Sequence, residues 1–344
     1  MSYLVKKKLP LLALQCTDFL LSALHKKATF GKIEKLLLCN IAHLGDIVIA
    51  TSVLPVLKAA LPHLKIGFLC SSSSSCVLQG HPEISWLHTL DHWKLNRTRM
   101  FKGKKALAYY ATKTRAVDEI RNIGYDAAID LYPFFPNAIP LLWKTKIPVR
   151  IGYKSGGFWP LLTHAIDWKE QHQYMADAHF DLLKQLPIEI SRENLHYSFP
   201  RSHFTDRWGL AEKFVIFHMG SGSKQKDWSE AAWREVAMGL NDRQIVFTGK
   251  GREENESIQR VTQGLSHCLN LCDQLAWEDF CSVVSKASQI ISVDSAIVHL
   301  AAAFAVPCVV LIVDSSNDAI LWTPSGTQRM IHPSAKDVLC KVSL

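Results

Sequence analysis

The aspartate at position 46 stands where one sequence pattern gives way to another. An apolar run, LLLCNI, ends in a short turn with one glycine, and Asp46 then opens a long apolar segment. This predicts a strand followed by a helix, with the carboxylate in the first helical turn. Such a carboxylate can cap the helix by accepting backbone N–H groups, which contributes about 1 kcal/mol. It can also be a general base that takes a proton from an acceptor hydroxyl, and the two roles are compatible.

A glycine- and serine-rich loop in the second half of the chain is typical of phosphate binding. It lies in HMGSGSKQKDWSEAAW, residues 218–233, and contains Ser221 and Gly222. Small residues allow backbone N–H groups to approach a phosphate closely. Lys224 and Lys226 add positive charge. The alternative interpretation is an ordinary loop with solvated lysines.

A second candidate anion site lies in ISVDSAIVHLAAAFAVP, residues 291–307. The pattern predicts a buried strand that ends at Asp294 and a helix that opens at Ser295. The first N–H groups of that helix, beginning with Ser295 and Ala296, would face an anion together with the positive end of the helix dipole. His299 lies one turn further along the same face. It can contact a phosphate or a sugar hydroxyl, or be an ordinary buried histidine.

Glu253 is a third candidate, because it follows the strand-like segment FTGKG near the start of the next helix. A carboxylate at this place can bind a ribose diol. It is also favourable simply because it interacts with the helix dipole.

Signatures of several other enzyme classes are absent. The turn before Asp46 is AHLGD rather than GxGxxG, and no GxxxxGK[ST] or GxSxG motif occurs. No Asp-x-Asp pair is present, which removes the usual carboxylates for a metal-bound nucleotide sugar. His267, Cys268, Cys272 and Cys281 lack CxxC spacing, so we expect no metal site. We expect no cofactor either.

Composition limits the class of protein. With 344 residues, 48% of them hydrophobic and 20% charged, the chain is typical of a globular protein with two domains. The formal charge of +8 favours an anionic partner, which can be a phosphorylated substrate, a membrane surface or nucleic acid. Nine scattered cysteines indicate reduced thiols in a reducing compartment.

Strand-like and helix-like segments alternate from residue 36 onward. This predicts an α/β fold with two Rossmann-like, doubly wound parallel sheets and a cleft between them. The expected strands are 35–41, 65–70, 126–131, 148–153, 214–220, 244–251, 289–295 and 307–313. The expected helices are 46–61, 104–123, 171–186, 229–240, 253–265, 277–287 and 295–305.

A polar break at residues 187–213 separates the two series of elements. We therefore expect an N-terminal extension at 1–33, an acceptor-side domain at 34–200, a nucleotide-sugar domain at 201–330 and a C-terminal tail at 331–344.

The extension contains an amphipathic helix within residues 6–27, with lysines at both ends. One interpretation is an interfacial helix that favours anionic lipid, and the other is a helix packed on the protein's own surface. One helical face is apolar and consists of Leu9, Leu12, Ala13, Cys16, Leu20, Ala23 and Leu24, while Gln15, Asp18 and Ser22 lie on another.

The motifs, taken in order, resemble those of glycosyltransferase family 9, the ADP-heptose:lipopolysaccharide heptosyltransferases, over about residues 34–326. The resemblance implies the GT-B architecture, with the active site between two Rossmann-like domains. It also implies that Asp46 is the catalytic base. The donor-binding residues that it implies are Ser221 and Gly222 in the phosphate-side loop, Lys226 at the donor phosphates, Glu253 at the ribose, and Asp294, Ser295, Ala296 and His299 at the pyrophosphate and the transferred sugar.

The implied reaction is inverting, metal-independent transfer of a heptose from ADP-heptose to a lipid-linked glycan acceptor such as the lipopolysaccharide core. The expected location is the cytoplasm or the inner face of the cytoplasmic membrane, and no nucleic acid is expected as a partner. The chain departs from the family pattern at Ser52, where proline is frequent, and at Ala296, where glycine is usual. The segment 311–316 also lacks the usual LFG turn, which fits either a different donor or loss of activity. A nucleotide-sugar epimerase and a non-catalytic nucleotide-sugar-binding protein remain as alternatives.

Overall fold

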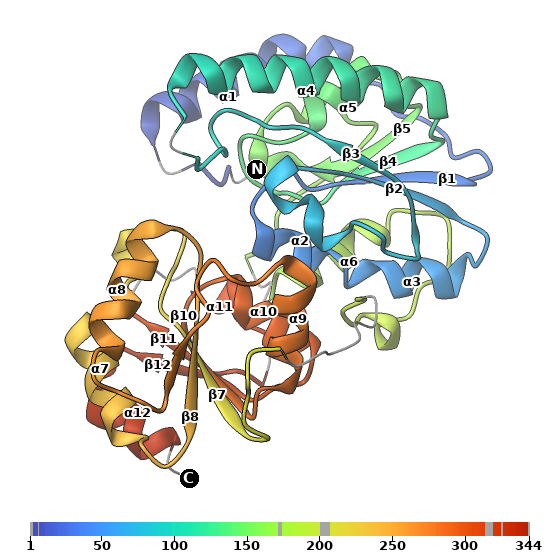
Figure 1. The fold of residues 1–344 in the computed structure, drawn as a ribbon. Helices are drawn as coiled ribbons and strands as arrows, with labels where there is room; N and C mark the ends of the chain where they lie inside the picture. Colours follow the sequence, from blue (N-terminus) through green and yellow to red (C-terminus); the bar gives the residue numbers. More distant parts are fainter. Residues whose placement is uncertain are drawn as a thin grey trace. The chain divides into compact units, whose positions relative to one another are not determined.

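The computed structural model describes residues 3–5, 7–98, 100–170, 174–199, 207–313, 319–324 and 326–342. The chain divides into two compact units, Met1–Pro200 and Arg201–Leu344. Each unit has a six-stranded sheet with helices on its faces (Figure 1). The two-sheet α/β fold expected from the sequence is confirmed.

The sheet of unit 1 is parallel throughout and has the order β3-β2-β1-β4-β5-β6. The two strands at its centre, β1 and β4, are buried at every position except Lys35, because helices cover both faces. The direction of chain progression reverses between β1 and β4, which are paired with Cys39 opposite Asp130. The strands are β1 Lys35–Cys39, β2 Lys65–Cys70, β3 Ile84–Thr89, β4 Ala127–Asp130, β5 Val149–Tyr153 and β6 His164–Ile166.

The helix expected at 46–61 is divided in two by Thr51 and Ser52. The Thr51 hydroxyl donates to the carbonyl of Val48 at 2.8 Å, and the Ser52 hydroxyl donates to the carbonyl of Ile49 at 2.6 Å. Such hydroxyl bonds to earlier carbonyls bend helices. The helices of unit 1 are α1 Lys8–Leu21, α2 Leu44–Ala50, α3 Val53–Ala60, α4 Lys102–Ile123, α5 Ile139–Lys144 and α6 Met175–Leu183, with short 3₁₀ turns η1 Ser22–Leu24, η2 Ser72–Val77, η3 Lys154–Gly156, η4 Trp159–Leu161 and η5 Arg192–Asn194.

Unit 2 repeats the same plan, with the parallel order β12-β11-β10-β7-β8-β9. Here the progression reverses between β7 and β10. The strands are β7 Phe214–His218, β8 Gln244–Thr248, β9 Cys268–Asn270, β10 Gln289–Val293, β11 Cys308–Ile312 and β12 Gln328–Ile331. The helices are α7 Glu230–Gly239, α8 Arg252–Thr262, α9 Trp277–Lys286, α10 Ala296–Ala303, α11 Ala319–Trp322 and α12 Ala335–Val342, with a 3₁₀ turn η6 Lys224–Lys226.

The C-terminal segment 331–344, expected as a tail, contains α12. Its residues Ala335, Val338 and Val342 are buried in the core of unit 2 together with Trp233 of α7. This helix is therefore part of the second unit's hydrophobic core.

Candidate active site

Asp46 lies in the first turn of α2, immediately beyond the carboxyl end of β1. Its Oδ2 accepts a hydrogen bond from the backbone N–H of His43, the residue before the helix, at 2.9 Å. The capping role expected from the sequence is therefore present. The carboxylate is only half-buried, so the same group is also accessible for proton transfer.

Three side chains, those of Arg97, Tyr132 and Tyr174, interact electrostatically with Asp46. Burial lowers the pKa of Arg97, while electrostatic interactions with Asp46 and, to a smaller extent, Tyr132 raise it. Burial raises the pKa of Tyr132, and Asp46 raises it further. Burial also raises the pKa of Tyr174, with smaller contributions that include Tyr197 and Asp46. The phenols therefore stay protonated as hydrogen-bond donors, and Arg97 is a cation beside the carboxylate.

One buried carboxylate, Asp130, holds the backbone at Tyr132 in position. Asp130, the last residue of β4, accepts hydrogen bonds from the backbone N–H groups of Tyr132 at 3.2 Å and Ala138 at 2.8 Å. Burial raises the pKa of Asp130 to about 7, although these backbone bonds lower it. Asp46 and Tyr132 thus follow β1 and β4, the two strands between which the sheet reverses. Ligands of doubly wound sheets bind at this kind of place.

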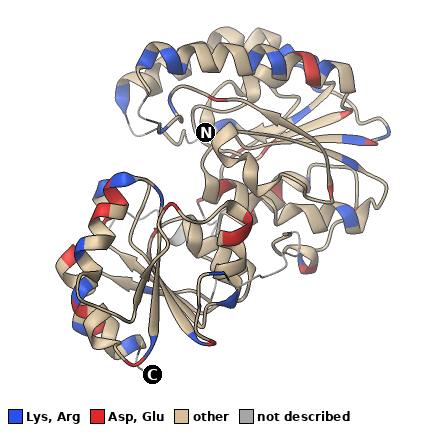
Figure 2. Ribbon diagram, viewed as in Figure 1, with Lys and Arg blue, Asp and Glu red and all other residues tan. Residues whose placement is uncertain are grey.

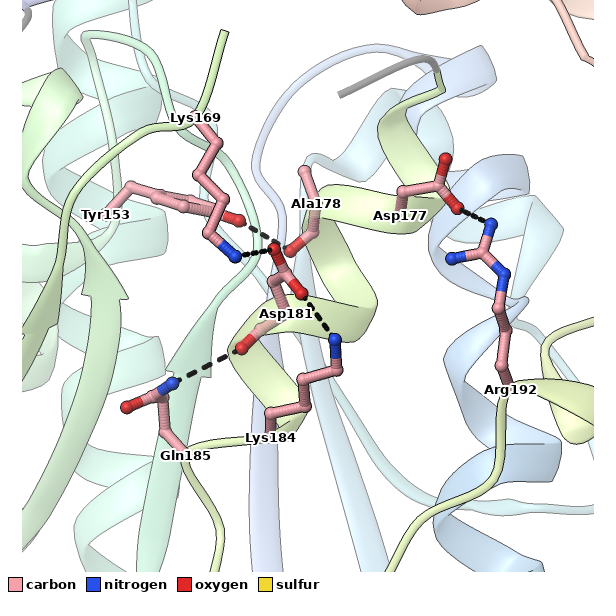
Figure 3. A network of polar contacts seen from close by, with 8 residues as sticks. All are labelled: Tyr153, Lys169, Asp177, Ala178, Asp181, Lys184, Gln185 and Arg192. Atoms are coloured by element: carbon pink, nitrogen blue, oxygen red, sulfur yellow. Dashed lines mark hydrogen bonds and ion pairs between the residues drawn. The ribbon is translucent and has the colours of Figure 1, made fainter. Parts of the chain in front are cut away.

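A polar network fixes α6, which begins directly after Tyr174 (Figure 3). The Asp181 carboxylate accepts from Lys169 at 2.7 Å and from Lys184 at 2.8 Å. The Tyr153 hydroxyl, from β5, donates to the carbonyl of Ala178 at 2.7 Å. The helix is thereby attached to the sheet, and this attachment positions Tyr174 near Asp46.

In unit 2, Lys226 and Asp294 form an ion pair with 2.5 Å between Nζ and Oδ2. Lys226 ends the 3₁₀ turn that follows β7, and Asp294 follows β10. These are again the two strands between which the sheet reverses. The side chain of Lys226 is 41% exposed, so its ammonium remains available to a ligand.

The helix after Asp294 begins at Ala296, and Ser295 is its N-cap without a side-chain capping bond. The Ser295 hydroxyl instead lies 3.1 Å from that of Ser292. His299 is buried, and burial lowers its pKa to about 4; Asp294 raises this pKa and Lys226 lowers it. His299 is therefore neutral near pH 7. The structure thus groups Lys226, Asp294, Ser295, Ala296 and His299, as the sequence motifs suggest.

Hydrogen bonds from Ser221 stabilise the loop after β7. The Ser221 hydroxyl donates to the carbonyl of Ser223 at 2.6 Å and to Asp227 Oδ1 at 3.1 Å. Gly222 lies in the same loop and is exposed. Because this loop also carries Lys226, it joins the two anion-binding motifs into one region.

Glu253 and Glu254 both lie in the first turn of α8, but they face different ways. Glu253 is exposed. Glu254 points toward the loop after β7, since a Cβ atom added to Gly220 would lie 2.0 Å from its Oε1. Burial raises the pKa of Glu254. Of the two glutamates, Glu254 is therefore the one that faces the phosphate-side loop, and the sequence motifs alone do not single it out.

Sequence motifs also do not identify all of the residues near Asp46. Arg97 and Tyr174 lie in loops far from Asp46 in the sequence, and no spacing relates them to it. Tyr132 is different, because it comes directly after a predicted strand, where ligand-binding residues are expected.

The altered segment 311–316 lies partly outside the described residues, since 314–316 are not among them. Among the described residues, no group of three or more His, Cys, Asp or Glu side chains could hold a metal ion.

Comparison with known proteins identifies the family of these motifs. The family model for glycosyltransferase family 9 (heptosyltransferase) matches residues 114–336. Lipopolysaccharide heptosyltransferase 3 of Escherichia coli is 23% identical over 295 residues, which are 81% of this chain and 83% of that protein.

Solved structures share the fold. The family 9 glycosyl transferase from Veillonella parvula has a TM-score of 0.70 at 21% identity, covering 92% of this chain and 93% of that one. The E. coli heptosyltransferase WaaC, solved with ADP, has a TM-score of 0.70 at 16% identity, covering 90% of this chain and 99% of that one. Both comparisons cover at least 90% of this chain, so the similarity of fold includes both of its units.

Proposed function

Because the chain belongs to glycosyltransferase family 9 (heptosyltransferase), we propose that it transfers a heptose from ADP-heptose to a glycan acceptor of the lipopolysaccharide-core type. The relatives support this choice of substrates, since E. coli proteins of this family are named as lipopolysaccharide heptosyltransferases and WaaC binds ADP. The observation that carries the proposal is the group of Lys226, Asp294 and the α10 N-terminus, located where the sheet of unit 2 reverses.

On the donor side, the diphosphate is the group whose negative charge increases as the sugar leaves. The Lys226 ammonium and the first N–H groups of α10 stabilise that charge, which is the electrostatic role that contributes most in such reactions. Asp294 holds Lys226 in place before the donor binds. Ser221 and Gly222 contribute backbone contacts to the phosphates, and His299 contributes an uncharged hydrogen-bonding group. Glu253, or its neighbour Glu254, binds the ribose diol.

On the acceptor side, Asp46 removes the proton from the attacking hydroxyl. Attack on the face opposite the departing diphosphate inverts the anomeric centre. Arg97 is a cation beside Asp46 and attracts an anionic acceptor. No step in this scheme requires a metal ion, so we expect activity to persist in EDTA.

The donor assignment is tested by calorimetric titration with ADP, UDP and GDP, followed by an ADP-release assay with ADP-heptose and a lipopolysaccharide-core acceptor. Lys226→Met is expected to weaken ADP binding at least tenfold, because it removes a charge-assisted contact to the diphosphate. Lys224→Met is the matched control: it removes an exposed lysine of the same turn and should leave affinity within twofold.

Three results would contradict the proposal. Preferential binding of UDP or GDP would exclude an ADP-sugar donor. Conversion of a nucleotide sugar without any acceptor would indicate an epimerase. Tight ADP-heptose binding without turnover on any core acceptor would indicate a binding protein.

A further inference from the structure

The N-terminal helix α1 and the following turn η1 expose a continuous stripe of apolar side chains. Every residue of the apolar face expected from the sequence is exposed. The inward face is instead built on Leu14 and Asp18, which are 5% and 3% exposed. The large exposed side chains are Leu9 at 79%, Leu12 at 58%, Phe19 at 79%, Leu20 at 75% and Leu24 at 48%.

The helix is held in this orientation by its buried carboxylate. Asp18 Oδ1 accepts from the backbone N–H of Phe158 at 2.6 Å, and Oδ2 accepts from the Tyr3 hydroxyl at 2.8 Å. Leu14 packs so closely on Gly157 that an added Cβ would lie 2.9 Å from its Cδ2. Turning the apolar stripe inward would break both hydrogen bonds and remove Leu14 from its packing on Gly157. The exposed stripe is therefore part of the folded unit.

The stripe is bordered by positive charge and has no exposed carboxylate within residues 7–27. Lys7 and Lys8 lie at the start of the helix, Lys26 and Lys27 lie beyond its end, and all are exposed. Asp18 is the only acidic residue of this segment, and it is buried. Apolar side chains between lysines are the pattern of a helix that lies in the plane of an anionic membrane surface.

Neighbouring elements of unit 1 also expose apolar side chains and lysines. The helix α1 packs on η4, η4 packs on α5, and α5 packs on α4. On α4, Leu107 and Tyr110 are 70% and 64% exposed. Figure 2 shows Lys and Arg along α4, which begins with Lys102 and Lys104 and carries the acidic pair Asp118 and Glu119 in its second half.

We propose that this surface docks unit 1 onto a bilayer that contains anionic phospholipid, with α1 lying in the interface. No helix among the described residues is long and apolar enough to cross a membrane, so α1 would lie on the surface rather than span the bilayer. Pairing of the stripe with a second copy of the chain is less favourable, because it would place two sets of lysines against each other.

The first experiment measures co-flotation of the full chain with vesicles of phosphatidylcholine, with and without phosphatidylglycerol, and with no sugar donor present. Binding is expected only with phosphatidylglycerol and should weaken as salt is raised. Replacing two flanking lysines, Lys26→Gln with Lys27→Gln, should weaken binding by about 25-fold, since each lysine contributes about fivefold.

Leu12→Glu with Leu20→Glu should abolish co-flotation, because both carboxylates would enter the interface. Ile331→Glu is the matched control: Ile331 is a comparably exposed apolar side chain, at 68%, in unit 2. It should bind vesicles as the unchanged chain does. All these side chains are exposed, so thermal unfolding should be unaffected, which separates lost docking from lost folding.

A second experiment uses the two exposed cysteines, Cys16 on the stripe and Cys340 on α12. An environment-sensitive dye on Cys16, in a Cys340→Ser background, should shift to the blue when anionic vesicles are added. The same dye on Cys340, in a Cys16→Ser background, should not.

Equal co-flotation of the unchanged chain and the Leu12→Glu, Leu20→Glu variant would overturn the proposal. So would a chain that does not bind vesicles but forms a dimer that the same variant dissociates. Because these assays contain no donor or acceptor, their outcome is independent of the proposed transferase activity.

Discussion

Replacing Asp46 separates its two roles, because one role needs an acceptor oxygen and the other needs a base. In Asp46→Asn, the amide oxygen can still accept the N–H of His43, which Asp46 accepts at 2.9 Å. The interaction of the charge with the helix dipole is lost, about 0.3–1 kcal/mol at a half-exposed site, together with its interaction with Arg97. In Asp46→Ala the hydrogen bond is lost as well, and the cost rises to about 1–2 kcal/mol.

These costs correspond to a fall in the unfolding temperature of about 2–4 °C for each kcal/mol in a unit of this size. Turnover should not follow stability in this way. Both variants lack the proposed base, so both should lose about 10²- to 10⁴-fold in kcat. Donor affinity should stay within twofold, since the proposed donor contacts come from unit 2.

The assays are thermal unfolding, calorimetric ADP titration and ADP release with acceptor, all on the full chain well below its unfolding temperature. The two variants should differ in stability and agree in turnover. If Asp46→Asn keeps turnover within a few fold of the unchanged chain while Asp46→Ala loses it in proportion to stability, then Asp46 is a helix cap and the proposed mechanism is wrong.

Three further predictions concern stability. Asp18→Ala leaves the N–H of Phe158 without its acceptor and should destabilise the attachment of α1 by about 1–3 kcal/mol, seen as faster hydrogen exchange of α1 amides; unchanged exchange would contradict the anchoring role. Gly67→Ala places a Cβ 1.8 Å from the Tyr125 hydroxyl and should lower the free energy of unfolding by about 1–3 kcal/mol in urea titrations; a neutral effect would show that the ring has room to move. His299 has a folded pKa of about 4, below its ordinary value of 6.5, so its contribution to stability is complete above pH 6.5 and is lost as pH falls toward 4. Unfolding temperatures measured across that range should fall less steeply in His299→Leu, and equal slopes would show that the histidine is not held neutral.

The strands that the sequence predicts and those that it misses differ in position. All eight expected strands are present, and each lies in the interior of its sheet. The four that were not expected, β3, β6, β9 and β12, are the edges. Interior strands are covered on both faces and read as continuous apolar runs, whereas these edge strands are partly exposed and carry mixed residues. The apolar runs that predict strands in this sequence therefore identify the strands that are buried, and not those at the sheet edges.

The same distinction applies to the site. Asp294 lies at the end of a predicted strand, and Asp46 and Lys226 lie a few residues beyond the ends of two others, so the position of each at a carboxyl edge could be predicted from local pattern. Arg97 and Tyr174 reach Asp46 through the tertiary fold, and local pattern carries no information about them. Helical periodicity likewise identified the apolar stripe of α1. It could not indicate that one buried carboxylate, Asp18, would determine which side of the helix faces the protein.

The attachment of α1 has a mechanical consequence. If a flexible linker joined a surface-binding helix to its domain, the domain could adopt many orientations relative to the surface that the helix binds. Here the carboxylate of Asp18 bonds the helix to the main chain at Phe158, which follows β5 in the same unit. Any surface that binds the helix thereby sets the tilt of the whole first sheet, and with it the direction in which the carboxylate of Asp46, the proposed base, faces.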